Sequence, residues 1–291
     1  MRYSLAIVAT IAASVQAHGV ISEIQGANGV NMPGLSVQDG TPRDCASPLC
    51  GSEADTSIIR DREMGGKASA LGRTQGGGAV DAGAAIAMFM GGGAATGAAG
   101  NNKRGLLDAL TGGAGGAGGA GGAAGGAAAA GTKTPKGTTE KGVAAAAGTG
   151  ATSGLPTTAD DGTVTMTFHQ VNQDGAGPLT AQIDATSGGT DPAAFQDATV
   201  TQNVPGIGIG GLSAASVMDF PVKVQMPAGM TCQGTAGGAS NVCVVRMQNA
   251  ALAGPFGGSA AFTQSTAAKK RAVEYNLRKR HMARGILGKP E

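Results

Sequence analysis

The chain has 291 residues, and 53 of them are glycine and 55 alanine, so more than a third of its side chains are too small to build a large core. Its formal net charge is only +2, from 21 Lys and Arg against 19 Asp and Glu. This near balance argues against a nucleic-acid-binding protein, which needs a strong positive field. Charged residues make up 14% of the sequence, which is also too few for a coiled coil.

The first 17 residues have the pattern of a secretory signal peptide. Arg2 supplies a positive charge, residues 5–15 form an apolar stretch too short to span a bilayer, and Val15 and Ala17 are small residues at the cleavage-determining positions. We expect cleavage after Ala17, so that the mature chain begins at His18. No later apolar stretch reaches the length of a membrane span. The sequence therefore predicts a secreted, extracellular protein, which we expect to be a monomer.

Composition divides the rest of the chain into four segments. Residues 18–64 are varied in sequence, and residues 65–154 consist mostly of Gly, Ala and Thr. Residues 155–266 contain short runs of β-forming residues, and residues 267–291 form a basic tail. The Gly/Ala-rich segment buries too little apolar surface to offset the entropy of ordering its backbone, which predicts a disordered insertion. Within it, only 85–90 and 105–110 favour short helices.

The β-forming runs predict a mainly β fold. They occupy residues 163–168, 181–184, 198–202, 221–226 and 242–248. Short strands at this spacing indicate an immunoglobulin-like or fibronectin-like β-sandwich. We expect an N-terminal strand from 18–64 to join the sandwich across the insertion, because loop-closure entropy grows only slowly with loop length.

The basic tail predicts a short C-terminal helix, because Val273 and Leu277 have helical spacing. The tail also contains Lys270-Arg271 and Arg278-Lys279-Arg280, which are either dibasic processing sites or part of a solvated helix face.

Three histidines are present, and two of them suggest a metal site. Cleavage after Ala17 would give His18 a free α-amine beside its own imidazole. The pKa of such an amine is about 7.7, so His18 could chelate one metal ion through two nitrogens. His169 follows the strand 163–168 and falls on the face opposite Phe168, away from the core, where it could supply a third nitrogen. Three nitrogens in one plane suit a single copper ion. His281 lies in the basic tail, and we expect it to have no part in the site.

A less specific interpretation is also open for each histidine. His18 could be first in the mature chain by accident of the cleavage point, and His169 could be an ordinary surface or capping residue. Separately, Asp174 with Glu23 could form the acid and base of a hydrolase.

Several motifs resemble a known family. The sequences HGVI at 18–21, FHQVNQDGAGP at 168–178, NVCVVR at 241–246 and AGPFGG at 253–258 are similar to the fungal appressorium-associated family of secreted virulence factors (Gas/Egh type). The resemblance covers both predicted sandwich segments and part of the tail, and it implies a pathogenicity factor that acts during host penetration. The histidine-first architecture is in turn similar to lytic polysaccharide monooxygenases, whose copper lies in a histidine brace on an immunoglobulin-like sandwich.

This second resemblance implies a role for several residues. His18 and His169 match the copper ligands, and Gln248 matches the catalytic amide that orients the oxygen co-substrate. Phe256 or Phe262 would lie axial to the copper. The implied activity is copper-dependent oxidation of a wall polysaccharide. Two alternatives are a secreted copper-binding protein without catalysis and a structural or adhesive surface factor without metal.

Aromatic residues, at 3% of the sequence, bear on the substrate. Tyr275 is the only tyrosine after the predicted cleavage point, and enzymes that bind flat crystalline glucans usually present several surface aromatic rings. We therefore expect a non-crystalline extracellular polysaccharide, with pectin or hemicellulose favoured over cellulose, as the partner.

The four cysteines of a secreted chain indicate disulfides. Of the three possible pairings we favour Cys45 with Cys50 and Cys232 with Cys243, and a zinc site is the rival interpretation. Members of the family that the chain resembles commonly have cysteines where this sequence has Ala181, Met247 and Ser259. The paired absence at Ala181 and Met247 suggests the loss of one disulfide.

Overall fold

The computed structural model describes residues 18–38, 40–92, 127–139, 142–173, 175–207, 212–251 and 254–283. Its strands are β1 (Gly19–Gln25), β2 (Asn31–Pro33), β3 (Ser57–Ile58), β4 (Arg73–Thr74), β5 (Gly78–Ala79), β6 (Ala127–Ala128), β7 (Thr132–Lys133), β8 (Thr163–Gln170), β9 (Thr180–Asp184), β10 (Phe195–Asn203), β11 (Met218–Gln225), β12 (Gly234–Ala236), β13 (Ala239–Gln248) and β14 (Phe256–Phe262). Its helices are α1 (Ala82–Phe89), α2 (Gly150–Ser153) and α3 (Thr266–Ala283), with single turns at Pro48–Cys50, Asp61–Glu63 and Pro192–Ala194.

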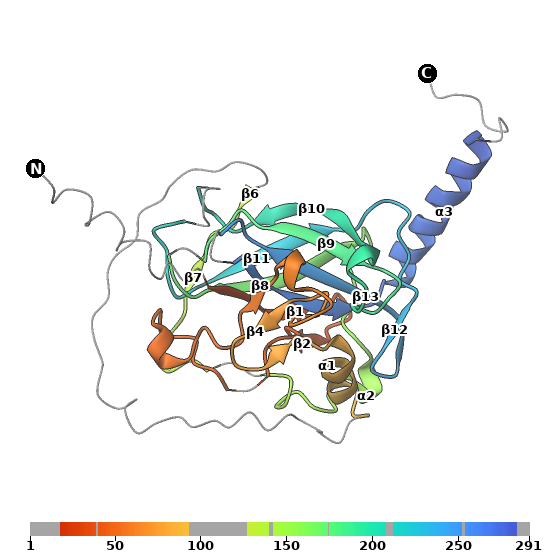
Figure 1. Ribbon diagram of the computed structural model, residues 1–291. Coiled ribbons are helices and arrows are strands. Elements are labelled where there is room, and N and C mark those ends of the chain that lie inside the picture. Colours follow the sequence, from red (N-terminus) through yellow and green to blue (C-terminus); the bar gives the residue numbers. More distant parts are fainter. Residues whose placement is uncertain are drawn as a thin grey trace, which may run out of the picture.

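The strands form two packed layers that share β10. One layer has the order β2-β1-β8-β11-β10, and the other has the order β10-β9-β13-β14-β3-β4-β5. The first half of β10 pairs with β9 and the second half with β11, so the sheet is continuous from one layer to the other. β1 packs against β14 of the opposite layer (Figure 1). The mainly β fold is confirmed, whereas the immunoglobulin-like or fibronectin-like topology is not confirmed by this strand order.

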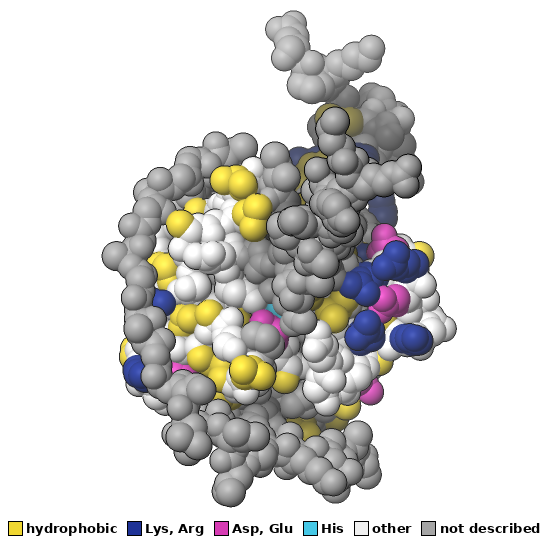
Figure 2. All heavy atoms as spheres, turned by 60° about the vertical axis from the view of Figure 1, so that its left-hand side comes forward, with side chains coloured by type: hydrophobic (Ala, Val, Ile, Leu, Met, Phe, Trp, Pro, Cys, Tyr) yellow, Lys and Arg dark blue, Asp and Glu magenta, His cyan; other side chains and the backbone are white. Residues whose placement is uncertain are grey.

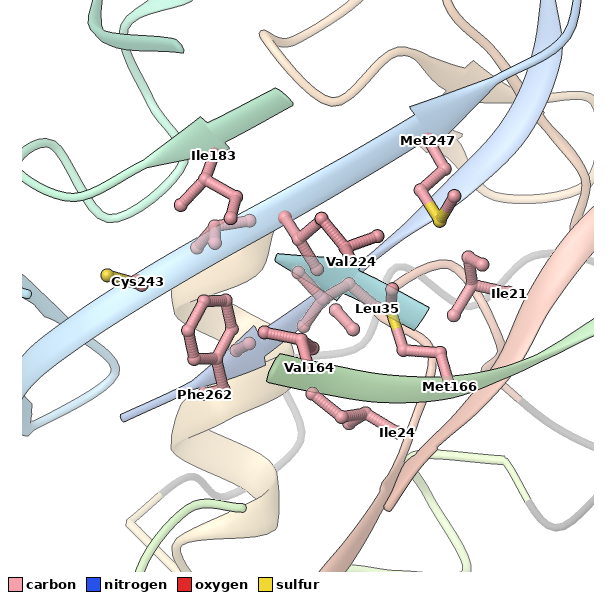
Figure 3. Packing of buried hydrophobic residues seen from close by; sticks show 14 of the residues in the cluster. Ile21, Ile24, Leu35, Val164, Met166, Ile183, Val224, Cys243, Met247 and Phe262 are labelled. Carbon is pink, nitrogen blue, oxygen red and sulfur yellow. The ribbon is translucent and has the colours of Figure 1, made fainter. Parts of the chain in front are cut away.

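The core lies between the two layers. Val164 and Met166 of β8 point toward Ile183 of β9 and Met247 of β13 (Figure 3). In β8 the apolar residues are buried while Thr163, Thr165 and Thr167 are partly exposed, as the period of two in a strand requires. Each such buried side chain contributes about 1.5–3 kcal/mol relative to exposure.

Four of the five predicted runs lie wholly in strands, and the run 221–226 extends one residue beyond the end of β11. The expected N-terminal strand is β1, which pairs with β8. β14, whose residues are FGGSAAF, was not predicted. The reason is close packing between the layers, since a Cβ at Gly258 would lie 2.6 Å from the backbone nitrogen of Ile21. A strand that approaches its neighbour this closely needs glycine, and glycine conceals it among turn residues.

The prediction that residues 65–154 form a disordered insertion is wrong at both ends. Leu71, Ile86 and Phe89 on one flank and Val143 on the other are buried in the main core. These few large side chains supply the apolar surface that composition alone did not suggest. α1 contains the helix expected at 85–90, and its first turn is capped by the carboxylate of Asp81. Residues 93–126, including the helix expected at 105–110, lie outside the described residues, as does the predicted signal peptide.

The predicted basic C-terminal helix is α3, described to residue 283. The Ser265 hydroxyl accepts a hydrogen bond from the Ala268 amide at 3.1 Å and so caps the helix. Ala268 and Ala272 are buried against the sandwich, while the C-terminal part of the helix projects away from it (Figure 1). Across the described chain, no helix is both long enough and apolar enough for a membrane span.

Both favoured disulfides, Cys45–Cys50 and Cys232–Cys243, are present. Ala181 of β9 stands directly opposite Met247 of β13 in the antiparallel register. The two positions where the related family commonly has cysteines are therefore cross-strand neighbours, in agreement with the loss of one disulfide as a pair.

Replacement of Phe89 by alanine tests whether α1 belongs to the core. We expect Phe89→Ala to lower the free energy of unfolding by about 3–5 kcal/mol, because it leaves a cavity at a fully buried site. Urea unfolding measures the change. Ala84→Ser on the exposed side of the same helix is the control and should stay within about 0.5 kcal/mol of the wild type. A loss for Phe89→Ala no larger than that of the control would place α1 outside the core.

The double variant A181C/M247C tests the register between β9 and β13. Directly opposite residues in antiparallel strands have Cα atoms about 4.5–5.5 Å apart, which is within the range of a disulfide. We expect the two new cysteines to form a disulfide, so that alkylation without a reductant adds no mass to the variant. The oxidised variant should also melt at a higher temperature than its reduced form. Two freely alkylated thiols under oxidising conditions would contradict the register.

Candidate functional site

His18 lies immediately before β1 and is almost fully buried. Its backbone nitrogen donates a hydrogen bond to Asn172 Oδ1 at 2.8 Å, and its carbonyl accepts one from the Val171 amide at 3.0 Å. The ring atom Nδ1 lies 3.5 Å from Glu53 Oε1, and Asn172 Nδ2 donates to the same carboxylate oxygen at 3.0 Å. The main-chain nitrogen and the imidazole of His18 are thus both held in fixed positions.

His169, in β8, is also buried, with no exposed surface. Its Nδ1 is 2.7 Å from Oδ1 of Asp219, which stands opposite it on β11. Its other ring nitrogen, Nε2, is buried and has no hydrogen-bond partner among the described residues. Burial lowers the pKa of His169, although the hydrogen bond to Asp219 opposes this effect, so the neutral imidazole is favoured. A neutral imidazole is the form that binds metals.

His169 lies on the face of the sheet opposite the main core, as expected, but it is buried there and not exposed to solvent. It alternates with Phe168, yet its side of the sheet is covered by the segment that contains Arg43, Glu53 and Asp55. Cys45–Cys50 closes a short loop within this segment. The burial comes from a part of the chain far away in the sequence, which strand alternation alone does not show.

The pairing of β1 with β8 places the two histidines side by side. Val20 is opposite His169, and the hydrogen bond between His18 and Val171 continues the ladder by one more pair. His18 and His169 are therefore diagonal neighbours, at Cα separations of about 7–8 Å, which is within reach of aromatic side chains. Figure 2 shows histidine atoms at one small spot near the middle of one face, beside an acidic side chain.

Buried charges surround this pair. Arg43 Nη2 lies 2.6 Å from Asp55 Oδ2, and both side chains are nearly inaccessible. Burial raises the pKa of Asp55, and the attraction to Arg43 opposes the rise. No sequence motif marks Arg43, Glu53 and Asp55 as part of a site, and only the predicted disulfide beside them indicates that this segment is ordered.

Of the two phenylalanines proposed to lie axial to the metal, Phe256 is next to the site. Its ring centroid is 4.6 Å from that of His18. Phe262 is at the other end of β14, opposite Cys243, in the main core (Figure 3). The structure thus separates two candidates that the sequence could not.

Gln248 ends β13 and pairs with Gly257, the residue after Phe256. Its side-chain oxygen Oε1 is buried and accepts no hydrogen bond from the part of the chain described here. Its side-chain amide therefore retains hydrogen-bonding capacity.

A cluster of charged side chains holds the turn that precedes Phe256. Arg60 Nε donates to the Gly254 carbonyl at 2.9 Å, and Arg60 Nη1 donates to Glu63 Oε1 at 2.8 Å. Arg73 Nε donates to the other oxygen of Glu63 at 2.7 Å. Hydrogen bonds from Arg60 and Arg73 lower the pKa of Glu63 from 4.5 to about 2.

Other predicted residues are not part of this arrangement. His281 is exposed on α3, and Asp174 lies outside the described residues, so the proposed hydrolase pair with Glu23 is untested. Among the described side chains, no group of three or more His, Cys, Asp and Glu residues is placed to hold a metal ion. A brace needs only two histidine side chains and a terminal amine, so this finding does not test it.

Comparisons with known proteins agree on one family. The sequence profile of the Egh16-like virulence factors matches residues 16–257. The appressoria-specific virulence factor GAS2 of Pyricularia oryzae is 61% identical over 289 residues, which cover 98% of this chain and 97% of the relative. The appressoria-specific virulence factor GAS1 of the same fungus is 39% identical over 129 residues, covering 43% of this chain and 50% of that relative. No solved structure matches the chain.

The Glu63 cluster predicts a pH dependence of stability. The folded-state pKa is depressed, so the contribution of Glu63 is present above pH 4.5 and is lost as the pH falls from 4.5 to about 2. We expect Glu63→Gln to flatten this part of the curve of unfolding free energy against pH, measured by urea unfolding. Glu274→Gln, on the exposed side of α3, should keep the wild-type curve. Identical curves for Glu63→Gln and the wild type would refute the assignment.

Proposed function

Because the chain belongs to the Egh16-like virulence factor family, and is thereby a fungal pathogenicity factor, we propose that it is secreted for host penetration and binds one copper ion through His18 and His169. We further propose that it acts oxidatively on a non-crystalline wall polysaccharide, in the manner of lytic polysaccharide monooxygenases. The proposal requires that cleavage after Ala17 turns the backbone nitrogen of His18 into a free amine.

The observation that carries the proposal is the hydrogen bonding of the two ring nitrogens of His169. Its Nε2 is buried without a partner among the described residues, while Asp219 holds Nδ1. An unpaired buried nitrogen costs about 1–3 kcal/mol, so its retention favours a ligand at this point. A carboxylate on the other ring nitrogen is the usual partner of a metal-binding histidine. Cleavage after Ala17 would add the amine and the imidazole of the neighbouring His18, and nitrogen ligands of this kind suit copper.

Each nearby residue has a definite task in this site. When bound, copper would supply one-electron redox chemistry. His18 and His169 would hold it, Asp219 fixes the ring of His169, and Phe256 covers the His18 ring against water. The free Oε1 of Gln248 gives its amide the capacity to orient a co-substrate.

The second candidate is a secreted protein that captures or delivers copper without catalysis. It is favoured by the nearly complete burial of both histidines, which leaves little room for a polymer to reach them. Glu53, 3.5 Å from the His18 ring, adds a negative charge that favours a bound cation.

Copper binding by the secreted protein tests the proposal. We expect intact mass to show a chain that begins at His18, one copper per chain, and a nitrogen-rich type 2 signal in electron paramagnetic resonance. His169→Ala should abolish this signal, and Asp219→Asn should weaken copper affinity about 10–100-fold. The exposed His281→Ala is the matched control and should leave both unchanged. A different first residue, or an unchanged spectrum for His169→Ala, would overturn the brace.

Activity on polymers separates the two candidates. Reductant-dependent release of oxidised oligosaccharides from pectin or hemicellulose, lost in His169→Ala, would establish the oxidative enzyme. Tight copper binding without oxidised products from any wall polymer would establish copper capture instead.

A further inference from the structure

A groove of about 450 Å³ lies between α3, the end of β11 and the part of β10 where its pairing partner changes from β9 to β11. This volume is within the range of small-molecule binding sites. The groove includes none of the residues of the proposed copper site. Its polar lining comes from Asp161, Asp197, Gln225 and Arg271, and Tyr275 forms part of its wall.

The helical wall of the groove is held in place. Asn276 Nδ2 donates to the Gly229 carbonyl at 2.8 Å, and Gln264 Nε2 donates to the Met230 carbonyl at 2.9 Å. Gly229 has a φ of +80°, and a Cβ on it would lie 2.8 Å from Cδ1 of Tyr275. Glycine at this turn therefore lets the tyrosine ring rest on the backbone, which fixes the position of the ring.

Tyr275 presents a half-exposed ring at the groove, with 46% of its surface accessible. A tyrosine ring combines an apolar face with a polar tip and loses little entropy when it is covered. It is the only aromatic residue that lines the groove. One ring beside hydrogen-bonding groups can cover the C–H face of one sugar residue.

The polar groups around the ring favour an uncharged ligand. Asp161 is held by the Thr163 amide at 2.8 Å, and this hydrogen bond lowers its pKa, so the carboxylate is ionised. Among the charged residues that line the groove, Asp161 and Asp197 outnumber Arg271, so the groove disfavours an anion, while carboxylates readily accept hydrogen bonds from hydroxyl groups. Thr199 of β10 pairs with Gln225 of β11 at the groove, and the β10 residues before Thr199 pair with β9.

We propose that this groove is a second binding site, for a single chain of a neutral oligosaccharide whose sugar ring stacks on Tyr275 and whose hydroxyls bind Asp161 and Gln225. This site goes beyond the proposed copper function and operates without metal. It would hold the protein on a matrix polymer by one strand of that polymer, because one ring in a groove cannot grip a flat crystal face.

Tyrosine fluorescence offers a direct test. The chain has no tryptophan and two tyrosines, so the secreted protein without its first 17 residues carries Tyr275 as its only strong fluorophore. We expect xylohexaose or mannohexaose to change this fluorescence saturably in the presence of a chelator. Hexagalacturonate, which is anionic, should bind more weakly.

Calorimetry of variants assigns the binding to the groove. We expect Tyr275→Ala and Asp161→Asn to weaken binding about tenfold or more, and Tyr275→Phe to retain it. Val273→Ala is the matched control, because Val273 is equally exposed on the same helix and lies outside the groove. Melting temperatures near that of the wild type would show that the variants are folded.

Three outcomes would overturn the site. They are no saturable binding of any neutral oligosaccharide, a loss in Val273→Ala equal to that in Tyr275→Ala, and tighter binding of hexagalacturonate or of a peptide. Binding should persist in His169→Ala, so failure of this proposal and failure of the copper proposal are distinguishable.

Discussion

The antiparallel pairing of β1 with β8 is the constraint on which the rest of the candidate site depends. It joins the first residues after the predicted signal peptide to a strand that begins 144 positions later, and its register sets His169 opposite Val20. One further hydrogen bond, from Val171 to His18, extends the pairing to the predicted new N-terminus. Because the register of a ladder leaves no freedom along the strand, the two histidines become neighbours without any local motif.

The other residues of the candidate site come from elements that pack against β1 and β8. Asp219 comes from β11, on the far side of β8, and its second carboxylate oxygen accepts a hydrogen bond from Thr134 at 3.1 Å. Thr134 belongs to the segment whose composition predicts disorder. A Gly/Ala-rich sequence thus contributes to the site through a few polar and large residues, since ordering needs only enough contacts at the right places. Phe256 arrives from the opposite layer and covers His18.

The two proposed sites lie in different parts of the fold. The proposed copper site is buried and built on strands, whereas the groove is open and lies where α3 meets the sandwich. The position of Tyr275 shows where one of the few aromatic residues lies. The one tyrosine after residue 17 lies in the groove, where we propose that it contacts a single polysaccharide chain.

Local sequence patterns were sufficient for the strands with alternating apolar residues, the basic helix and both disulfides, because these depend on residues close together in the chain. They were not sufficient for β14, for α1 as part of the core, or for Glu53, Asp55 and Arg43 around the histidines. The choice of Phe256 over Phe262 also came from the structure, since both end the same strand. Burial, the partner of each charge and the meeting of distant segments depend on how the two layers close, and no short stretch of sequence contains that information.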